Sequence, residues 1–219
     1  MPDYYHKYIK YKAKYLQLKY PKMIGGNKLV IHISGPSGSG KSTLGNKLKK
    51  EFGKKIVVKD VDDLQLEFIK IEYGNNEIKK FNANKYQKWI DDFVAKQIKP
   101  LVFVGLNHMY WWHKDLYYDM HSNYNFYIDI DSDIIFKQKC SRMMDNVFVD
   151  YREQLLKNMI KNENKTLKHI QLMLEGECGY KFIKKLNNMW YKDYKKQNYK
   201  FMSREKIFEK VKKILNVNQ

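Results

Sequence analysis

Residues 28–43 read KLVIHISGPSGSGKST, an apolar β-branched run followed directly by a glycine-rich segment. The run Lys28–Ser34 is typical of a buried strand. The segment Gly35–Thr43 matches the pattern GxxxxGK[ST] in full. A helix is predicted next, over Lys41–Phe52, and Gly53 stands where a glycine commonly ends a helix. The sequence therefore predicts a strand, a tight loop and a helix in immediate succession.

The glycine-rich segment has the residue types that binding of a triphosphate requires. Its glycines permit backbone dihedrals that turn successive amides inward, into a concave nest for phosphate oxygens. The positive end of the following helix points at the same place. Lys41 is expected to neutralise the β- and γ-phosphates, and the Ser42 hydroxyl is expected to hold Mg²⁺. The residues predicted to bind ATP are Gly35, Ser37, Gly38, Ser39, Gly40, Lys41, Ser42 and Thr43.

Four further short apolar runs alternate with helix-like segments along the rest of the chain. Strands are predicted over 54–59, 101–104, 125–130 and 199–202. Helical segments are predicted from about 60 to 99, where Trp89, Ile90 and Phe93 are the expected core contacts, from Ser132 onward, and over 204–215. Strands separated by helices indicate an α/β domain with a parallel sheet and crossover connections.

Three carboxylates follow the second predicted strand, at Asp60, Asp62 and Asp63. Ligands of open α/β sheets bind at the carboxyl ends of the strands, so these residues are expected beside the phosphate loop. Asp60 and Asp62 are candidates to accept a proton from an attacking hydroxyl or to orient it, with Asp60 the expected base for a hydroxyl acceptor, and Asp63 is a candidate to contact the substrate. Asp60 is also a candidate to hold Mg²⁺, directly or through water. The alternative is a solvated helix N-terminus, where acidic residues are favoured in any case.

Residues 28–145, with the final strand and helix, resemble the P-loop kinases of nucleosides and nucleotides, a family that includes nucleoside monophosphate, uridine-type, and shikimate or gluconate kinases. The resemblance is carried by GPSGSGKST, the aspartates after the second strand, Gly105 after the third, and a hydrophobic strand that ends in Asp before a basic helix. It implies a three-layer α/β sandwich with a five-stranded parallel sheet in the order 2-3-1-4-5 and a helical lid.

In that family a basic helix begins a lid whose arginines clamp the transferring phosphoryl group. The resemblance implies this role for Arg142, with Lys137 or Lys139 assisting; an ordinary exposed helix face is the alternative. The chain departs from the family because only Arg142 is clear, with Arg152 ten residues further on. The region 151–197 is also long and basic enough to be a separate helical insertion. Its aromatic residues are expected to be core rather than a base-stacking platform: Tyr180, Phe182, Trp190, Tyr191 and Tyr194.

The loop after the third strand begins Gly105-Leu106-Asn107-His108 and continues with aromatic residues over 110–113. In related kinases this loop lines the acceptor pocket, so Gly105, Asn107 and His108 are candidate substrate contacts. Asn107 and His108 are able to hydrogen-bond a base or sugar. The alternative is a packed aromatic helix start.

The chain has 219 residues and a formal net charge of +18, which is concentrated at its two ends. Residues 1–22 carry six Lys against one Asp, and residues 151–219 carry 17 Lys or Arg against seven acidic residues. Such ends attract phosphate-rich partners, nucleic acid among them, although Lys and Asn are also the residues of AT-rich codons. Two cysteines and the lack of an apolar run long enough to span a bilayer predict a soluble intracellular protein.

The first 26 residues are predicted to form a separate element. Tyr4, Tyr8, Tyr11, Tyr15 and Leu18 recur at helical spacing among lysines, and Pro21 and Gly25-Gly26 end the helix. A helix that docks by its aromatic stripe is one interpretation, and an anchoring or nucleic-acid-binding arm is the other. The leader resembles the Tyr/Lys-rich N-termini, closed by Gly-Gly, of many proteins encoded by giant DNA viruses of amoebae. The kinase-like domain is expected over 27–219, with a lid or insertion over about 137–197.

Three functions remain open on these residues. The first is an ATP- and Mg-dependent kinase that phosphorylates a small nucleoside- or nucleotide-like acceptor, by way of Lys41, Asp60, Asp62 and Arg142. The second is a polynucleotide 5′-hydroxyl kinase, for which the basic ends would track a phosphate backbone. The third is a P-loop ATPase without phosphotransfer, in which residues 126–131 (FYIDID) would be the Walker B strand. The oligomeric state is left open.

Overall fold

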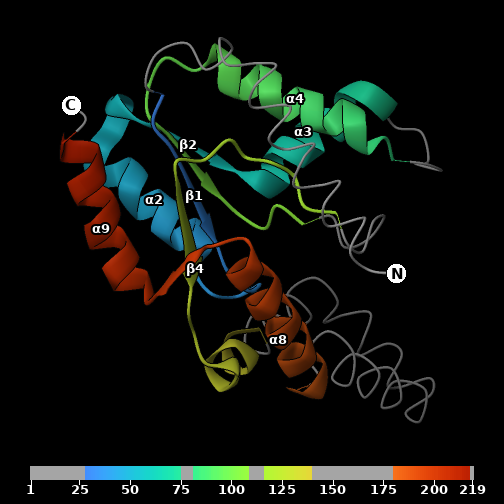
Figure 1. Cartoon of the computed structure of the whole chain (residues 1–219), viewed down its shortest axis with the longest axis vertical. Coiled ribbons are helices and arrows are strands. Elements are labelled where there is room, and N and C mark those ends of the chain that lie inside the picture. The colour runs from blue at the N-terminus through green and yellow to red at the C-terminus, as the bar shows by residue number, and fades with distance from the viewer. Residues whose placement is uncertain (1–27, 75–80, 109–115, 140–179, 218–219) are drawn as a thin grey trace, which may run out of the picture.

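The computed structural model describes residues 28–74, 81–108, 116–139 and 180–217. Predictions for the leader 1–26, for the aromatic residues 110–113, and for Arg142 and Arg152 fall outside these ranges. The described part contains a five-stranded, all-parallel sheet in the order β2-β3-β1-β4-β5. Its strands are β1 Val30–Ser34, β2 Val57–Asp60, β3 Leu101–Val104, β4 Tyr124–Ile128 and β5 Lys200–Met202 (Figure 1). The predicted fold class and strand order are confirmed.

Helices cover both faces of the sheet, so the molecule has three layers. The helices are α2 Lys41–Phe52, α3 Val61–Tyr73, α4 Ala83–Lys96, α8 Tyr180–Lys196 and α9 Arg204–Val217, with a 3₁₀ helix η1 at Gly53–Lys55; residues 132–139 are also helical. In Figure 1, α2 and α9 lie on one side of the sheet, with α3, α4 and α8 on the other. Because both faces are covered, the central strands β1 and β3 are fully buried and consist mostly of apolar residues.

Alternate residues of β1 enter different hydrophobic clusters, as the period of a strand requires. Ile31 and Ile33 pack with Leu44 and Leu48 of α2 and with Ile207 of α9. On the opposite face the packing partners come from α3 and α4. Val30 of β1 belongs to this cluster together with Val61, Leu64, Phe68, Tyr86 and Ile90. A third cluster joins Tyr127 of β4 to Trp190 and Tyr194, so α8 docks on the α4 side of the sheet.

Two boundary predictions are wrong in an informative way. The second strand begins at Val57 rather than at Lys54, because Gly53–Lys55 forms a 3₁₀ turn directly after α2. The predicted fourth strand extends two residues too far, since β4 ends at Ile128. The helical stretch predicted from 60 to 99 contains two helices. The first ends at Gly74, whose φ is 62°, and Asn82 begins the second by accepting a hydrogen bond from the amide of Lys85 at 3.0 Å.

The topology places the carboxyl ends of the strands that carry the predicted site residues at one edge of the sheet. All strands run in parallel, so the carboxyl ends of β1, β2 and β3 lie together, and ligands of open α/β sheets bind at this edge. β1 leads into the glycine-rich loop and α2, while β2 leads without a loop into α3. Among the described residues, none of the helices has both the length and the apolar character needed to cross a bilayer.

Candidate active site

The glycine-rich loop wraps around its own lysine. The amide of Ser39 donates to the carbonyl of Pro36 at 3.1 Å, and Gly40 takes a left-handed conformation, φ 84° and ψ 25°, as the N-cap of α2. The ammonium group of Lys41 donates to the carbonyl oxygens of Gly35 and Pro36, each at 2.9 Å. The cation is therefore held at the inner side of the loop, next to the amides at the positive end of α2.

Ser42 and Asp60, the two residues predicted to hold Mg²⁺, lie in direct contact. The Ser42 hydroxyl donates to one carboxylate oxygen of Asp60 at 3.0 Å, although 18 residues separate them. The other oxygen of Asp60 accepts from the amide of Asp62 at 3.0 Å and so caps α3. Ser37, Thr43 and Asp63 are exposed, and Ser39 is buried beneath the loop.

Mg²⁺ prefers oxygen ligands and is usually held by one or two protein groups together with substrate phosphates and water. The Ser42 hydroxyl and the Asp60 carboxylate supply such oxygens beside the phosphate loop. In the ranges that the structure describes, His, Cys, Asp and Glu side chains do not gather in groups of three or more that would form a dedicated metal cage. The donor set therefore fits Mg²⁺ that enters with a nucleotide.

Asp62 differs electrostatically from its neighbour. Although Asp62 is exposed, desolvation by the surrounding protein and the nearby charge of Asp60 raise the pKa of its carboxyl above the ordinary value, while the ammonium of Lys41 opposes the shift. Both carboxylate oxygens of Asp60 accept hydrogen bonds, one from the Ser42 hydroxyl and one from the α3 backbone. The two carboxylates thus differ in their chemistry, because both oxygens of Asp60 are engaged in hydrogen bonds whereas Asp62 has the raised pKa that makes it the better proton acceptor.

Gly105, at the end of β3, brings the following loop close to α3; because this loop is predicted to contact the acceptor, we call it the acceptor loop. Its φ is +145°, and a Cβ atom at this position would lie 2.7 Å from the Cβ of Val61 and 3.1 Å from its amide nitrogen. Only a residue without a side chain permits this approach. Because Val61 directly follows Asp60, the glycine sets the distance between the acceptor loop and the carboxylates.

We expect Gly105→Ala to lower the free energy of unfolding by about 2–4 kcal/mol, since it combines a steric clash with an unfavourable backbone conformation. Gly53→Ala is the matched control, because Gly53 also has positive φ, 55°, but open space where its Cβ would stand. Urea unfolding of the two variants measures the difference. Equal losses would show that the contact with Val61 is unimportant.

The next candidates in this loop are mostly engaged within the protein. Asn107 is 3% exposed; its amide nitrogen donates to the Tyr118 carbonyl at 2.7 Å, and its side-chain oxygen accepts from the Tyr194 hydroxyl at 2.7 Å. His108 is stacked on Tyr117, with ring centroids 4.5 Å apart. A direct contact of Asn107 with an acceptor has to use its second N–H. These bonds give Asn107 a structural role and tie this loop to α8.

A buried histidine lies behind the same loop. His32 of β1 is fully buried, with Nδ1 2.5 Å from the Tyr199 hydroxyl and Nε2 3.1 Å from the Gly105 carbonyl oxygen. Burial, with a smaller contribution from the charge of Lys41, lowers the pKa of His32 to about 4, against the hydrogen bond to Gly105, which raises it. The ring is therefore neutral at physiological pH, and it links β1 to the end of β3 and to the start of β5.

This burial predicts a specific loss of stability in acid. The unfolded chain takes up a proton near pH 6.5 and the folded chain only near pH 4, so the stability is complete above pH 6.5 and decreases as the pH falls between these values. The expected loss from His32 alone is roughly 3 kcal/mol. Urea unfolding of wild type and His32→Gln at pH 7.5 and 4.5 measures it. A pH dependence unchanged in the variant would contradict the assignment to His32.

Two basic side chains from other parts of the chain contact the glycine-rich loop. A Cβ atom on Gly40 would lie 2.6 Å from Nη1 of Arg204, the first residue of α9, and one on Gly38 would lie 3.3 Å from Cγ of Lys139. Lys139 was predicted to assist in the lid, whereas the sequence reasoning missed Arg204. Its only signal was rarity, because Arg204 is one of three arginines in the chain. Lys137 is exposed on the same short helix as Lys139.

The fold and this site together define a three-layer α/β protein with a glycine-rich loop at the carboxyl edge of its sheet. A scan of the sequence against protein-family models finds no match, and a search of curated proteins finds no significant relative. Any assignment of function therefore depends on the residues of the site.

Proposed function

We propose that this protein is an ATP- and Mg-dependent phosphotransferase that acts on a small nucleoside- or nucleotide-like acceptor. The observation that carries the proposal is the contact between Ser42 and Asp60 at the mouth of the phosphate loop. It joins an oxygen pair suited to Mg²⁺ to a loop whose residue types suit a triphosphate. The adjacent Asp62 is available for a second reactant.

The loop residues would divide the work of binding and charge neutralisation. The amides from Gly35 to Lys41 would bind phosphate oxygens, with Lys41 moving its ammonium from the loop carbonyls to the β- and γ-phosphates. Arg204 and Lys139 would add positive charge along the outer side of the loop. Bound Mg²⁺ would neutralise charge on the β- and γ-phosphates. Preorganised cations of this kind are the main source of catalysis in phosphoryl transfer.

The acceptor would approach from the side of α3 and the Gly105 loop. If it reacts through a hydroxyl, Asp62 is the better candidate to take the proton, because Asp60 is engaged with Ser42 and with the α3 backbone. The raised pKa of Asp62 also brings it closer to the range in which general bases are efficient. If the acceptor is a phosphate, no base is needed and both carboxylates serve to orient the reactants.

The test is transfer of label from γ-labelled ATP to a panel of nucleosides, nucleotides and 5′-hydroxyl oligonucleotides, with and without Mg²⁺. Label on a nucleoside or nucleotide is the expected result. Label on oligonucleotides alone would indicate a polynucleotide kinase, and phosphate release without any labelled acceptor would indicate an ATPase. Either result overturns the proposal in its present form.

A further inference from the structure

Helix α8 has one buried face and one strongly basic face. Ile183, Asn187, Trp190 and Tyr194 recur at spacings of four and three residues and are buried. Trp190 and Tyr194 pack with Tyr127 of β4. The prediction that the aromatic residues of this region belong to the core is thus confirmed for Trp190 and Tyr194. The rest of the helix surface carries six lysines, all exposed. They are Lys181, Lys184, Lys185, Lys192, Lys195 and Lys196, and we call them the α8 lysines.

These lysines have almost no acidic counterparts. The single acidic residue of α8 is Asp193, whose carboxylate accepts from the Tyr117 hydroxyl at 2.8 Å on the inner side of the helix. Lys196 lies 3.7 Å from the same carboxylate. By contrast, α9 carries two glutamates, Glu205 and Glu209, among its four lysines, and Lys212 also pairs with Glu51 of α2. The exposed surface of α8 therefore carries positive charge almost alone, and such a surface attracts a polyanion.

Exposed aromatic rings lie among the α8 lysines. Tyr180, Phe182 and Tyr191 are 39%, 38% and 40% exposed, so three of the five aromatic residues are not core. The Lys184 ammonium lies 5.7 Å from the centre of the Tyr180 ring, and that of Lys195 lies 5.8 Å from Tyr191. The Tyr191 ring also packs on Phe201 of β5, with centroids 4.6 Å apart, which holds it at the surface. Cations interleaved with aromatic faces are typical of surfaces that bind single-stranded nucleic acid.

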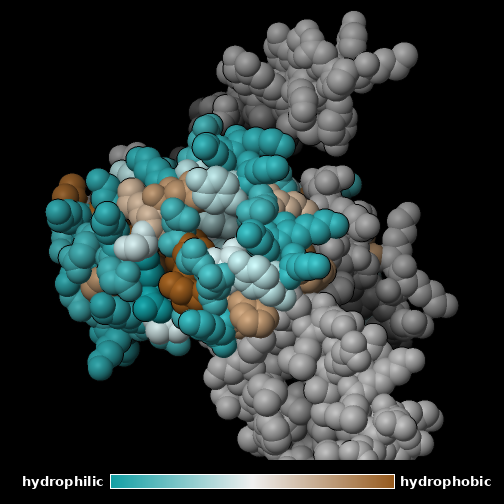
Figure 2. Space-filling model, turned by 90° about the horizontal axis from the view of Figure 1, so that it is seen from below, coloured by the Kyte–Doolittle hydropathy of each residue, from teal (hydrophilic) through white to brown (hydrophobic). Residues whose placement is uncertain are grey.

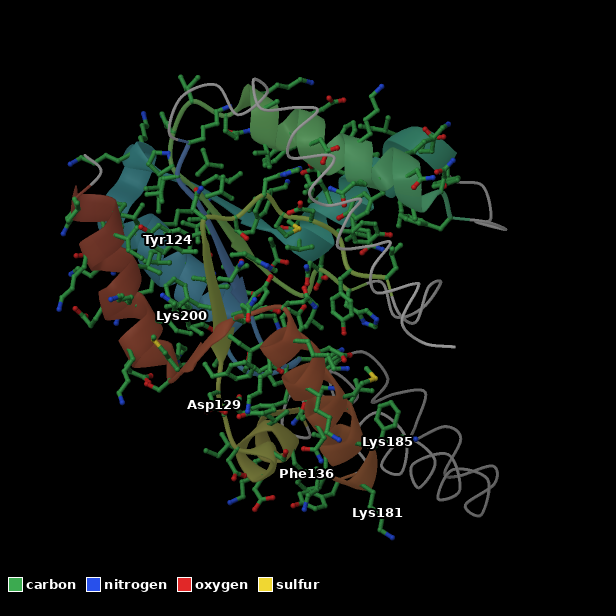
Figure 3. All side chains as sticks on the ribbon, viewed as in Figure 1. Tyr124, Asp129, Phe136, Lys181, Lys185 and Lys200 are labelled. Atoms are coloured by element: carbon green, nitrogen blue, oxygen red, sulfur yellow. The ribbon has the colours of Figure 1, made fainter. Side chains whose placement is uncertain are left out.

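The basic face is connected to the phosphate loop through a short chain of contacts. Tyr180, at the start of α8, makes an edge-to-face contact with Phe136, with centroids 5.7 Å apart. Phe136 belongs to the helix 132–139, whose Lys139 lies on Gly38 of the loop. Asp131 and Asp133 lie at this junction near Tyr180, so the positive surface begins beyond them, at Lys181. Figure 3 shows Lys181 and Lys185 on the end of α8 that is remote from the sheet.

We propose that the outer face of α8 binds a single-stranded polynucleotide, with the α8 lysines on its phosphates and Tyr180, Phe182 and Tyr191 against its bases. The lysines extend from Lys181 to Lys196, which is about 22 Å along the helix axis. This surface is separate from the phosphate loop, and binding there requires no ATP. Seen from below, the described surface of the protein is mainly hydrophilic, with a few apolar areas (Figure 2).

The experiment measures binding of a fluorescein-labelled deoxythymidine oligonucleotide to the full chain by anisotropy, at several salt concentrations. The α8 variant is Lys181→Gln, Lys185→Gln and Lys192→Gln. The matched control is Lys49→Gln, Lys50→Gln and Lys54→Gln, which removes the same charge from exposed positions at the end of α2 and in η1, across the sheet. Circular dichroism confirms that both variants are folded. Phe182→Ala tests the contribution of base stacking.

We expect the α8 variant to bind at least tenfold more weakly and the control variant less than threefold more weakly than wild type. The salt dependence of wild-type binding should weaken in the α8 variant, by about 0.7 in the log–log slope for each phosphate that no longer pairs with a lysine. Phe182→Ala should also weaken binding, because stacking contributes roughly 1–3 kcal/mol per base. An equal loss of oligonucleotide affinity in the two lysine variants would overturn the proposal. So would binding of heparin or anionic vesicles as tight as binding of the oligonucleotide, if Phe182→Ala had no effect on oligonucleotide affinity.

A Lys41→Met variant separates this inference from the proposed function. It should leave oligonucleotide affinity unchanged, because Lys41 is bonded inside the phosphate loop. If the wild-type protein bound the oligonucleotide but transferred no phosphate, the proposed function would be wrong and the proposal for the α8 surface would still hold. Phosphotransfer to a nucleoside without any oligonucleotide binding would do the reverse.

Discussion

Lys41→Met should lower the rate of phosphotransfer by roughly 10²–10³-fold, the range found when one preorganised donor is removed from a developing negative charge. The reason is the position of the ammonium group, which is held at 2.9 Å from two carbonyl oxygens of the phosphate loop and next to its amides. Methionine keeps the length of the side chain and removes the charge. The measurement is the initial rate of label transfer from γ-labelled ATP, with ATP affinity determined by calorimetry.

Lys50→Met is the control for this substitution, because Lys50 lies on the same helix in its last turn and is exposed. Its rate and ATP affinity should equal those of the wild type. If Lys41→Met retained full activity, the loop would not be the phosphate site. If both variants lost activity together, the cause would be a general loss of positive charge rather than the loop.

Asp60→Asn should lower the rate by about 10²-fold and raise the concentration of Mg²⁺ needed for half-maximal activity. Asparagine is the informative replacement because it is an equally good N-cap residue, so α3 keeps its cap while the negative charge disappears. The loss then reports on the charge beside Ser42 rather than on helix stability. Titration of activity with Mg²⁺ measures the effect. An unchanged Mg²⁺ dependence would remove Asp60 from the metal site.

Asp62→Asn distinguishes the two kinds of acceptor. For a hydroxyl acceptor, loss of the general base should cost about 10²–10⁴-fold, at unchanged Mg²⁺ dependence. Because the pKa of Asp62 is raised and the base must be deprotonated, the wild-type rate should increase as the pH rises through that raised pKa. The variant should lose this increase. For a phosphate acceptor, both the loss and the change in pH profile should be small.

The sequence predicted the part of the site in which neighbours in the chain are neighbours in space. The strand, glycine-rich loop and helix over 28–53 form as expected, because a glycine-permitted turn and an adjacent helix N-terminus are local features. The parallel sheet and its order follow from the same pattern of alternation together with the family resemblance. Boundaries were less accurate, since the turn at Gly53–Lys55 replaces two residues of the predicted strand.

Other features were beyond local patterns. The aromatic residues of α8 have nearly helical spacing throughout, yet Tyr194 is fully buried while Tyr191, three residues earlier, is 40% exposed. The spacing indicates an amphipathic helix, but the sheet decides which side is covered. Asn107 likewise has the chemistry of a substrate contact, and only the fold reveals that Tyr194 and Tyr118 engage its amide.

By itself, then, the sequence determined the glycine-rich loop between β1 and α2, the parallel α/β class and the set of carboxylates after β2, since these depend on residue types and short spacings. The tertiary structure alone decided that Ser42 meets Asp60, that Arg204 reaches Gly40 from the far end of the chain, and that the α8 lysines share one surface. The physical reason is that such contacts are fixed by how distant elements pack on the sheet, where the free energy depends on burial and shape rather than on separation along the chain.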